Sequence, residues 1–360
     1  MRVDQVIPSL ASRDAIGVHT INLRDGLRAA GIDSDIFYGS FTEDMAHEGS
    51  SVTELGRAGR DRWLLYQSSI GSPVYDIFAA REEPKLVNYH NITPAPLLRD
   101  WEPNVGYEVA LGRTQLGRLA AQSRFAVADS AFNESELHAL GYTDTAVVPL
   151  LIDMQAKSDV PDAALAAALA RGKADQGGAD LLFVGKISPH KAPHDLVKML
   201  SVLRRLYDPN ARLHLVGSPL GETYAPALHA FIAEMGLTEA VVFPGSVTGA
   251  ELEAYFQAAD VFVCASDHEG FCVPIAEAMG HGVPIVAYGV TAVPETVGGA
   301  GLLLPDKSAL PFAAAVGRVL TDPVLRQHLA AAGRTRAAQF DLAASQRRFV
   351  SLVGRAISAA

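Results

Sequence analysis

Short apolar segments alternate with segments of helical periodicity along almost the whole chain. Five apolar segments in the second half predict strands, at residues 181–185, 212–217, 240–245, 260–266 and 283–289. Between the first two, Leu196, Leu200, Leu203 and Tyr207 recur at the spacing of one helical face. Strands that alternate with helices indicate βαβ units, and therefore a parallel sheet with helices on both faces.

The first half shows the same alternation less regularly. Its apolar segments predict six strands, at residues 3–8, 34–39, 62–67, 85–90, 125–130 and 145–150. A helix should follow the first strand and end at Gly31. Another should begin near Asn133, because Glu136 stands three residues later as in a capping box. The pattern therefore predicts a second doubly wound α/β domain.

The segment between the two halves, residues 153–178, is rich in alanine, glycine and charged residues and shows no strand pattern. We therefore expect an N-terminal Rossmann-like domain over residues 1–152, a linker with one short helix over 153–178, and a C-terminal domain over 179–340. Doubly wound domains bind ligands beyond the carboxyl ends of their strands. A cleft in which the two domains face each other is thus the expected site.

Composition and charge narrow the class of protein. The 360 residues carry a net charge of −10, which argues against nucleic acid as a partner. The two cysteines, Cys264 and Cys272, lack the spacing of a metal-binding CxxC pair, as expected of a reduced cytoplasmic protein. No apolar run resembles a signal peptide or reaches the roughly 20 residues of a membrane-spanning helix. We expect a cytoplasmic protein, with peripheral attachment to the inner face of the membrane as an alternative.

Two lysines follow the strand predicted at residues 181–185. Lys186 comes directly after the strand, and Lys191 lies where the next helix is expected to begin. Two ammonium groups beside a helix N-terminus form a suitable site for a diphosphate. The alternative is a pair of ordinary surface lysines, and the position after a strand favours the diphosphate site only slightly.

Two glutamates, Glu269 and Glu277, flank the start of the helix that follows the strand at residues 260–266. Backbone N–H groups of Gly270, Phe271 and Cys272 at this helix start are suited to phosphate oxygens. Glu269, just outside the helix, is suited to accept hydrogen bonds from sugar hydroxyls, and Glu277, about one turn inside it, from the two hydroxyls of a ribose. Alternatively, each carboxylate only stabilises the helix dipole, by about 0.5 kcal/mol.

A set of residues in the second domain matches a known signature at fixed spacing: Glu269, Gly270, Phe271, Pro274, Glu277, Ala278, Met279, Gly282, Pro284 and Ala287. With these residues the chain resembles the retaining GT-B glycosyltransferases, in particular the nucleotide-sugar-dependent glycosyltransferase family 4. Some positions depart from the family pattern. Lys186 stands where an arginine is usual and lacks the bidentate fork of arginine. Cys272 replaces a glycine, and Thr291 with Ala292 replaces a Gly-Gly pair.

The resemblance implies a GT-B fold with a donor site in the second domain. It places Glu269 at the hydroxyls of the donor sugar, Glu277 at the ribose, and the nucleobase near Ser218 and Val247. The other donor-binding positions lie at a strand end or a helix start: Gly185, Lys186, Lys191, Gly270, Phe271, Cys272 and Val273. Lys186, Lys191 and Glu269 are the implied catalytic residues of this domain. Because the lysines stabilise the leaving diphosphate, neither a metal nor another cofactor is required.

In the first domain the resemblance implies a glycine-containing loop on the acceptor side, represented by Asp14 and Gly17. His90, at the end of a predicted strand, is either catalytic or structural. The final helix, residues 341–360, is implied to cross back onto this domain. The acceptor is a glycan, a lipid-linked sugar or a small molecule. The arginine-containing segment 106–124 is either a membrane-surface helix or an ordinary solvated one.

We therefore expect a retaining glycosyltransferase that moves a hexosyl group from a nucleoside diphosphate sugar to an acceptor hydroxyl, in polysaccharide, lipopolysaccharide or glycolipid assembly. The alternatives are a sugar-nucleotide epimerase or a phosphorylase of the same fold, and a non-catalytic subunit that binds nucleotide sugar. A nicotinamide dehydrogenase is disfavoured because no GxGxxG sequence follows the first strand.

Overall fold

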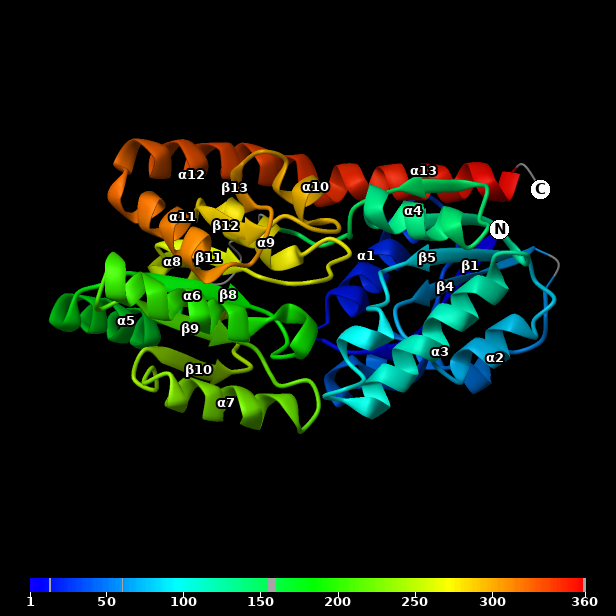
Figure 1. The fold of residues 1–360 in the computed structure, drawn as a ribbon. Helices are drawn as coiled ribbons and strands as arrows, with labels where there is room; N and C mark the ends of the chain where they lie inside the picture. Colours follow the sequence, from blue (N-terminus) through cyan, green and yellow to red (C-terminus); the bar gives the residue numbers. More distant parts are fainter. Residues whose placement is uncertain (13, 60, 155–159, 359–360) are drawn as a thin grey trace. The chain divides into compact units, whose positions relative to one another are not determined.

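The computed structural model describes residues 1–12, 14–59, 61–154 and 160–358, which form two compact units (Figure 1). Unit 1 comprises Met1–Ala95, Asn104–Asp153 and Phe340–Ala360, and unit 2 comprises Pro96–Pro103 and Met154–Gln339. Each unit contains one parallel sheet covered by helices, so the α/β class predicted from the alternating pattern is confirmed.

Unit 1 is built on a seven-stranded sheet in the order β3-β2-β1-β4-β5-β6-β7. Its strands are β1 Arg2–Leu10, β2 Ile36–Phe41, β3 Ser50–Ser51, β4 Arg62–Ser68, β5 Lys85–Tyr89, β6 Ser123–Ala128 and β7 Thr145–Val147. Val6 of β1 pairs with Phe37 on one side and with Tyr66 on the other. The order reverses between β1 and β4, and the loops that follow these two strands therefore flank a topological switch point.

Five α-helices cover the sheet of unit 1: α1 Ala15–Ala29, α2 Val74–Ala79, α3 Pro103–Leu119, α4 Ala131–Ala139 and α13 Leu342–Ser358. Leu23 and Leu27 of α1 share one buried cluster with Phe349 and Val353 of α13. These side chains stand four residues apart on each helix, so each pair lies on one helical face. The C-terminal helix is in this way part of the core of unit 1.

The start of α4 differs from the expectation. The helix begins at Ala131, and the Oγ of Ser130 accepts a hydrogen bond from the backbone N–H of Asn133. The predicted capping box at Asn133 is therefore wrong, because both of its polar side chains bond elsewhere. The Oδ1 of Asn133 accepts from Asn91, and the carboxylate of Glu136 accepts from the hydroxyl of Tyr89 at 2.8 Å. The helix is capped three residues earlier by Ser130, and the Asn133 side chain is left to a tertiary partner.

Unit 2 is built on a six-stranded sheet in the order β10-β9-β8-β11-β12-β13. Its strands are β8 Asp180–Val184, β9 Arg212–Val216, β10 Val241–Gly245, β11 Val261–Cys264, β12 Ile285–Tyr288 and β13 Gly301–Leu304. Successive strands extend the sheet in one direction from β8 and in the other from β11. The loops after β8 and β11 therefore flank the switch point of this unit.

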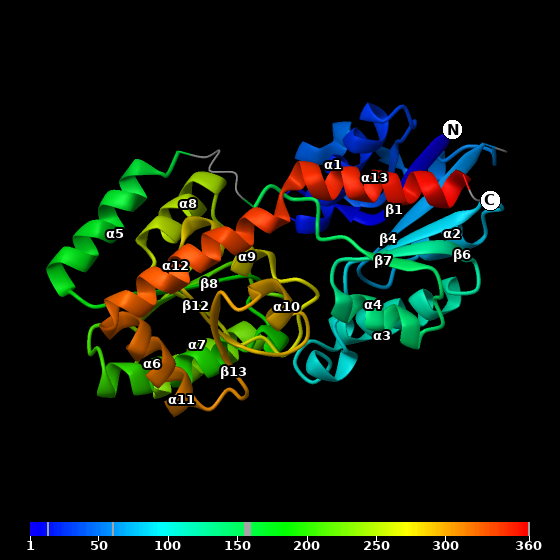
Figure 2. The ribbon, with the colours of Figure 1, turned by 90° about the horizontal axis from the view of Figure 1, so that it is seen from above.

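Eight α-helices belong to unit 2: α5 Ala163–Gln176, α6 Pro193–Leu206, α7 Tyr224–Glu234, α8 Gly249–Ala258, α9 Val273–His281, α10 Val293–Val297, α11 Ala309–Thr321 and α12 Pro323–Ala337. Leu196, Leu200 and Leu203 of α6 are fully buried in the core, as the helical spacing predicts. Helix α5, within the segment expected to be a linker, packs beside α8 (Figure 2).

Short 3-10 turns occur at Glu43–Glu48, Val52–Glu54, Ala95–Leu97, Pro189–Lys191 and Ala338–Phe340. Among the helices described, none combines the length and the apolar character that crossing a lipid bilayer would require.

The segment Pro96–Pro103 lies in the first half of the sequence but belongs to unit 2. It places Glu102 at the start of α7. The Glu102 carboxylate accepts hydrogen bonds from the backbone N–H groups of Glu222, Thr223 and Tyr224, the last two at 2.9 Å. Burial raises the pKa of Glu102, but these three donors outweigh burial and lower it below its ordinary value. Hydrogen bonds thus hold the segment Pro96–Pro103 against the loop that precedes α7.

Candidate functional site

The loops after β8 and β11 bring Lys191 and Glu269 into direct contact at the switch point of unit 2. The Lys191 ammonium lies 2.7 Å from both carboxylate oxygens of Glu269. The carboxylate is 8% exposed and the lysine side chain 21% exposed, so water screens the pair only weakly. Residues 78 positions apart in sequence form this ion pair because β8 and β11 are neighbours in the sheet.

Burial lowers the pKa of Lys191, but the adjoining Glu269 carboxylate outweighs burial and holds the pKa above its ordinary value. The lysine is therefore charged at neutral pH. It lies at the end of the 3-10 turn Pro189–Lys191, and helix α6 begins only at Pro193. The prediction that Lys191 begins the helix is thus wrong by two residues, because the chain makes a left-handed step at Ala192 first.

The backbone of Glu269 is held by the loop after β12. The Oγ1 of Thr291 accepts from the Glu269 N–H at 3.0 Å, and the Glu269 carbonyl accepts from the N–H of Ala292. The hydroxyl of Thr296, in the following helix α10, donates to the carbonyl of Phe271. The loop at residues 289–293 therefore supports the Glu269 loop, a role that the sequence did not indicate.

Lys186 differs from Lys191 in being exposed. Its ammonium donates to the Oγ of Ser218, in the loop after β9, at 3.1 Å. Gly185 has φ +153° and Gly217 has φ +142°, and a Cβ on Gly217 would lie 2.0 Å from the carbonyl oxygen of Gly185. The two strand ends can approach this closely because position 217 is glycine. Val247, half-buried, lies in the loop between β10 and α8.

Helix α9 starts beside the Lys191–Glu269 pair. Cys272, its N-cap, has φ +69°, a left-handed conformation that glycine adopts more easily. Gly270 and Phe271 precede this cap and Val273 is the first helical residue. Pro274 occupies the second helical position, where its missing N–H is harmless.

Glu277 lies one turn into α9 and is partly buried. Burial raises the pKa of Glu277 to about 7, while the nearby His281 acts in the opposite direction. A glutamate of this kind changes charge near neutral pH. Glu269, outside the helix, is instead paired with the Lys191 ammonium.

In unit 1, His90 belongs to a buried polar network. Its Nδ1 lies 2.9 Å from the Asp129 carboxylate, and its Nε2 lies 2.6 Å from the Oε1 of Gln67. The Nε2 of Gln67 donates in turn to Gln5. Burial raises the pKa of Asp129, and the adjoining His90 acts in the opposite direction. Both ring nitrogens of His90 therefore have partners within unit 1.

The partners of His90 could have been noticed in the sequence, because Gln67 and Asp129 stand at the ends of strands β4 and β6. Asp14 and Gly17 lie at the start of α1. The Asp14 carboxylate caps the helix by accepting from the Ile16 N–H at 3.3 Å. A Cβ on Gly17 would lie 2.4 Å from the carbonyl oxygen of Ala11, so this turn requires glycine.

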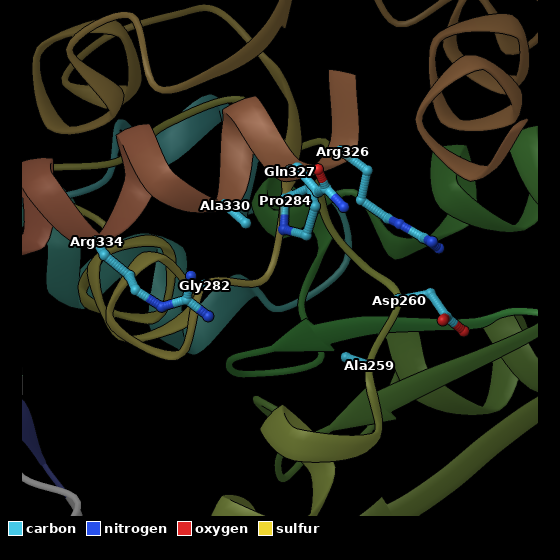
Figure 3. Close-up of a pocket in the computed structure, with 8 residues that line it drawn as sticks. All are labelled: Ala259, Asp260, Gly282, Pro284, Arg326, Gln327, Ala330 and Arg334. Atoms are coloured by element: carbon cyan, nitrogen blue, oxygen red, sulfur yellow. The ribbon is translucent and has the colours of Figure 1, made fainter. Parts of the chain in front are cut away.

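A cavity of about 420 Å³ in unit 2 lies away from these residues, between α12 and the segments that enter β11 and β12 (Figure 3). Its lining residues are Ala259, Asp260, Gly282, Pro284, Arg326, Gln327, Ala330 and Arg334. Asp260 and Pro284 immediately precede their strands, whereas Lys191 and Glu269 follow theirs. The cavity is therefore at the opposite edge of the sheet from the candidate site.

Comparison with solved structures identifies the fold. Over 99% of its length the chain superimposes on the whole of HepE from Anabaena, solved with UDP and glucose, with a TM-score of 0.78 at 17% identity. Sucrose-phosphate synthase from Thermosynechococcus elongatus gives a TM-score of 0.75 at 18% identity, with both chains fully covered. The fold of this chain is the GT-B fold, as the resemblance implied.

The sequence of unit 2 carries a more specific likeness. Residues 168–336 match the family model of glycosyl transferases group 1. A D-inositol 3-phosphate glycosyltransferase of Stackebrandtia nassauensis is 36% identical over 165 residues, which cover 44% of this chain and 37% of the relative. The chain spans about half or less of the length of the curated relatives that it matches. The matched segment contains Lys186, Lys191, Glu269 and Glu277.

Proposed function

We propose that the protein transfers a hexosyl group from a nucleoside diphosphate sugar to an acceptor hydroxyl, with retention at the anomeric carbon. The observation that carries this proposal is the Lys191–Glu269 ion pair at the switch point, inside the segment that matches the family model. HepE has been solved with UDP and with UDP-glucose, so a UDP-sugar is the first donor to test.

The ion pair would be exchanged when the donor binds. In its absence Glu269 holds the Lys191 ammonium in place and neutralises it. A diphosphate offers the ammonium a stronger anionic partner, and sugar hydroxyls offer the carboxylate donors in return. Both groups are therefore kept ready for the donor, with little reorganisation left for the reaction.

Departure of the diphosphate builds negative charge, which Lys191, Lys186 and the start of α9 would stabilise. Glu277 would accept from the ribose hydroxyls, and Ser218 and Val247 would border the nucleobase. The two lysines and the start of α9 would supply the positive charge that a divalent metal supplies in other transferases. We therefore propose a reaction that needs no metal. A front-face route, in which the leaving diphosphate assists deprotonation of the acceptor, is consistent with retention.

The acceptor side belongs to unit 1. We propose that Asp14 and Gly17 border the acceptor and that the buried Asp129 orients His90. The acceptor would be a glycan, a lipid-linked sugar or a small molecule in polysaccharide, lipopolysaccharide or glycolipid assembly. Such an enzyme would act in the cytoplasm, in solution or against the inner face of the membrane.

The test is a thermal-shift panel of UDP, GDP, ADP and TDP and their sugars, with and without a chelator. We expect stabilisation by one nucleotide class, unchanged by the chelator. Glu277→Ala should weaken nucleotide binding and Glu269→Ala should mainly slow turnover. Glu234→Ala, an exposed carboxylate at the end of α7, is the matched control. If both site variants behave like this control, the site assignment is wrong.

Product analysis separates the alternatives of the same fold. A transferase releases the nucleoside diphosphate only as the acceptor is glycosylated. An epimerase would convert the nucleotide sugar without an acceptor, and a non-catalytic subunit would bind the donor without turnover. The decisive experiment leaves out the acceptor, so that water is the only hydroxyl compound present. If the donor is then converted to another compound and is not hydrolysed, the transferase proposal is refuted.

A further inference from the structure

We propose that the turn between β11 and α9 binds a thiophilic divalent cation of the Zn²⁺ class. The ligands would be the Sγ atoms of Cys264 and Cys272 and one carboxylate oxygen of Glu269. The binding site itself does not depend on the proposed function, whereas its effect on turnover, given below, rests on that function.

The geometry is close to that of a metal site. The two sulfur atoms and a carboxylate oxygen of Glu269 all lie within 4.8 Å of one another, and all three residues are buried. A tetrahedral zinc ion with Zn–S bonds of about 2.3 Å holds its sulfur ligands about 3.7 Å apart. The two sulfur atoms would therefore have to approach each other by no more than about 1 Å.

The placement of the cysteines is a second indication. They are the only two in 360 residues, and the turn from strand to helix brings them together. Both are free thiols. Cys272 has the left-handed conformation in which a side chain is strained and glycine is favoured. A cysteine at such a position is better explained by what its sulfur binds than by its backbone.

The charges around the site are compatible with a cation. Two thiolates and a carboxylate carry three negative charges, which exceed the two positive charges of the metal. The Lys191 ammonium contacts both oxygens of Glu269, so it can keep one oxygen while the metal takes the other. Its charge then balances the three negative ligand charges and the two positive charges of the metal, so the complex is neutral overall.

The ligand set selects the kind of metal. Two sulfurs and one oxygen suit Zn²⁺, Cd²⁺ or Co²⁺, whereas Mg²⁺ and Ca²⁺ prefer oxygen ligands alone. Three protein ligands leave a fourth position for water. Because the metal would engage Glu269, the loaded protein should use its donor sugar more slowly than the metal-free protein. The cation would thus act as an inhibitor.

The test uses the full chain with its thiols reduced and titrates it with Co²⁺. Binding should produce the near-ultraviolet thiolate-to-cobalt charge-transfer absorption and the visible bands of tetrahedral Co²⁺. Zn²⁺ should abolish these bands and Mg²⁺ should not. Glu269→Gln should weaken Co²⁺ binding at least tenfold, and the double variant Cys264→Ser with Cys272→Ser should abolish the charge-transfer absorption. Glu277→Gln, a neighbouring carboxylate outside the cluster, should bind Co²⁺ within about twofold of the wild type.

A second measurement does not rely on the variants folding. Zn²⁺ should protect both cysteines of the wild-type protein from alkylation, as read by mass spectrometry. The proposal is overturned if the reduced wild type gives no cobalt–thiolate bands, or if Zn²⁺ fails to protect the two thiols. It is also overturned if the two cysteines form a disulfide in place of a metal complex. None of these readouts needs glycosyl transfer, so failure here and failure of the proposed function are distinguishable.

Discussion

The raised pKa of Glu277 predicts how donor binding depends on pH. If the carboxylate accepts hydrogen bonds from both ribose hydroxyls, only its ionised form binds the donor well. Burial raises the pKa of this group to about 7, from an ordinary value of 4.5. The affinity for the donor should therefore rise with pH through neutrality and then level off. Glu277→Gln removes the titrating group and should remove this slope.

The size of the effect follows from the ionised fraction. With a pKa of about 7, the carboxyl is about one-tenth ionised at pH 6 and about nine-tenths ionised at pH 8. The association constant should then be about tenfold higher at pH 8 than at pH 6, which corresponds to about 1.4 kcal/mol. The free energy of unfolding should show the opposite trend. Since the folded-state pKa is the higher one, the contribution of Glu277 is present below pH 4.5 and is lost as the pH rises toward 7.

The assay is calorimetric titration with UDP-glucose or, if the panel selects another nucleotide, its glucose ester. A diphosphate esterified at both ends stays fully ionised over this range, unlike free UDP, so its own titration does not contribute. The wild type is compared with Glu277→Gln at pH 6, 7 and 8. The assignment of Glu277 to the ribose would be refuted if the association constant changed equally with pH in the two proteins. It would also be refuted if the wild type bound the donor with an association constant that does not depend on pH.

Three further predictions concern stability and the ion pair. Glu102→Ala should lower the free energy of unfolding by about 1–2 kcal/mol in urea melts, since three N–H groups lose their acceptor. Asp100→Asn, on an exposed ion pair nearby, should change it by less than about 0.5 kcal/mol, and equal losses would contradict the capping role. Lys191→Met should cost about 2–3 kcal/mol, because Glu269 is left buried and unpaired, and a double variant that also changes Glu269 to Gln should recover part of this loss. Ser130→Ala should cost about 1 kcal/mol by thermal melting, and no loss would mean that the N-cap of α4 lies elsewhere.

Local patterns predicted the elements well. The buried strands β4 and β8 contain continuous apolar runs, and the buried residues of α6 recur at helical spacing. Both patterns can be recognised in the sequence because they involve only neighbouring residues. The signature around Glu269 and Glu277 also identified the loop after β11, since the loop and its helix are contiguous in sequence. The start of α4 is the instructive failure. The sequence suggests a capping box at Asn133, but Ser130 caps the helix three residues earlier, and the side chains of Asn133 and Glu136 bond to Asn91 and Tyr89.

The sequence by itself determined two α/β units, most of their strands, and the loops that carry charged side chains, but it did not predict the strands β3 and β13. Only the tertiary structure decided which of these side chains meet. The strand order places β8 beside β11, so Lys191 pairs with Glu269, whereas Lys186 pairs with Ser218. The same packing surrounds His90 with Asp129 and Gln67. These contacts depend on strand neighbours that are far apart in sequence, and no local pattern of residues specifies such neighbours.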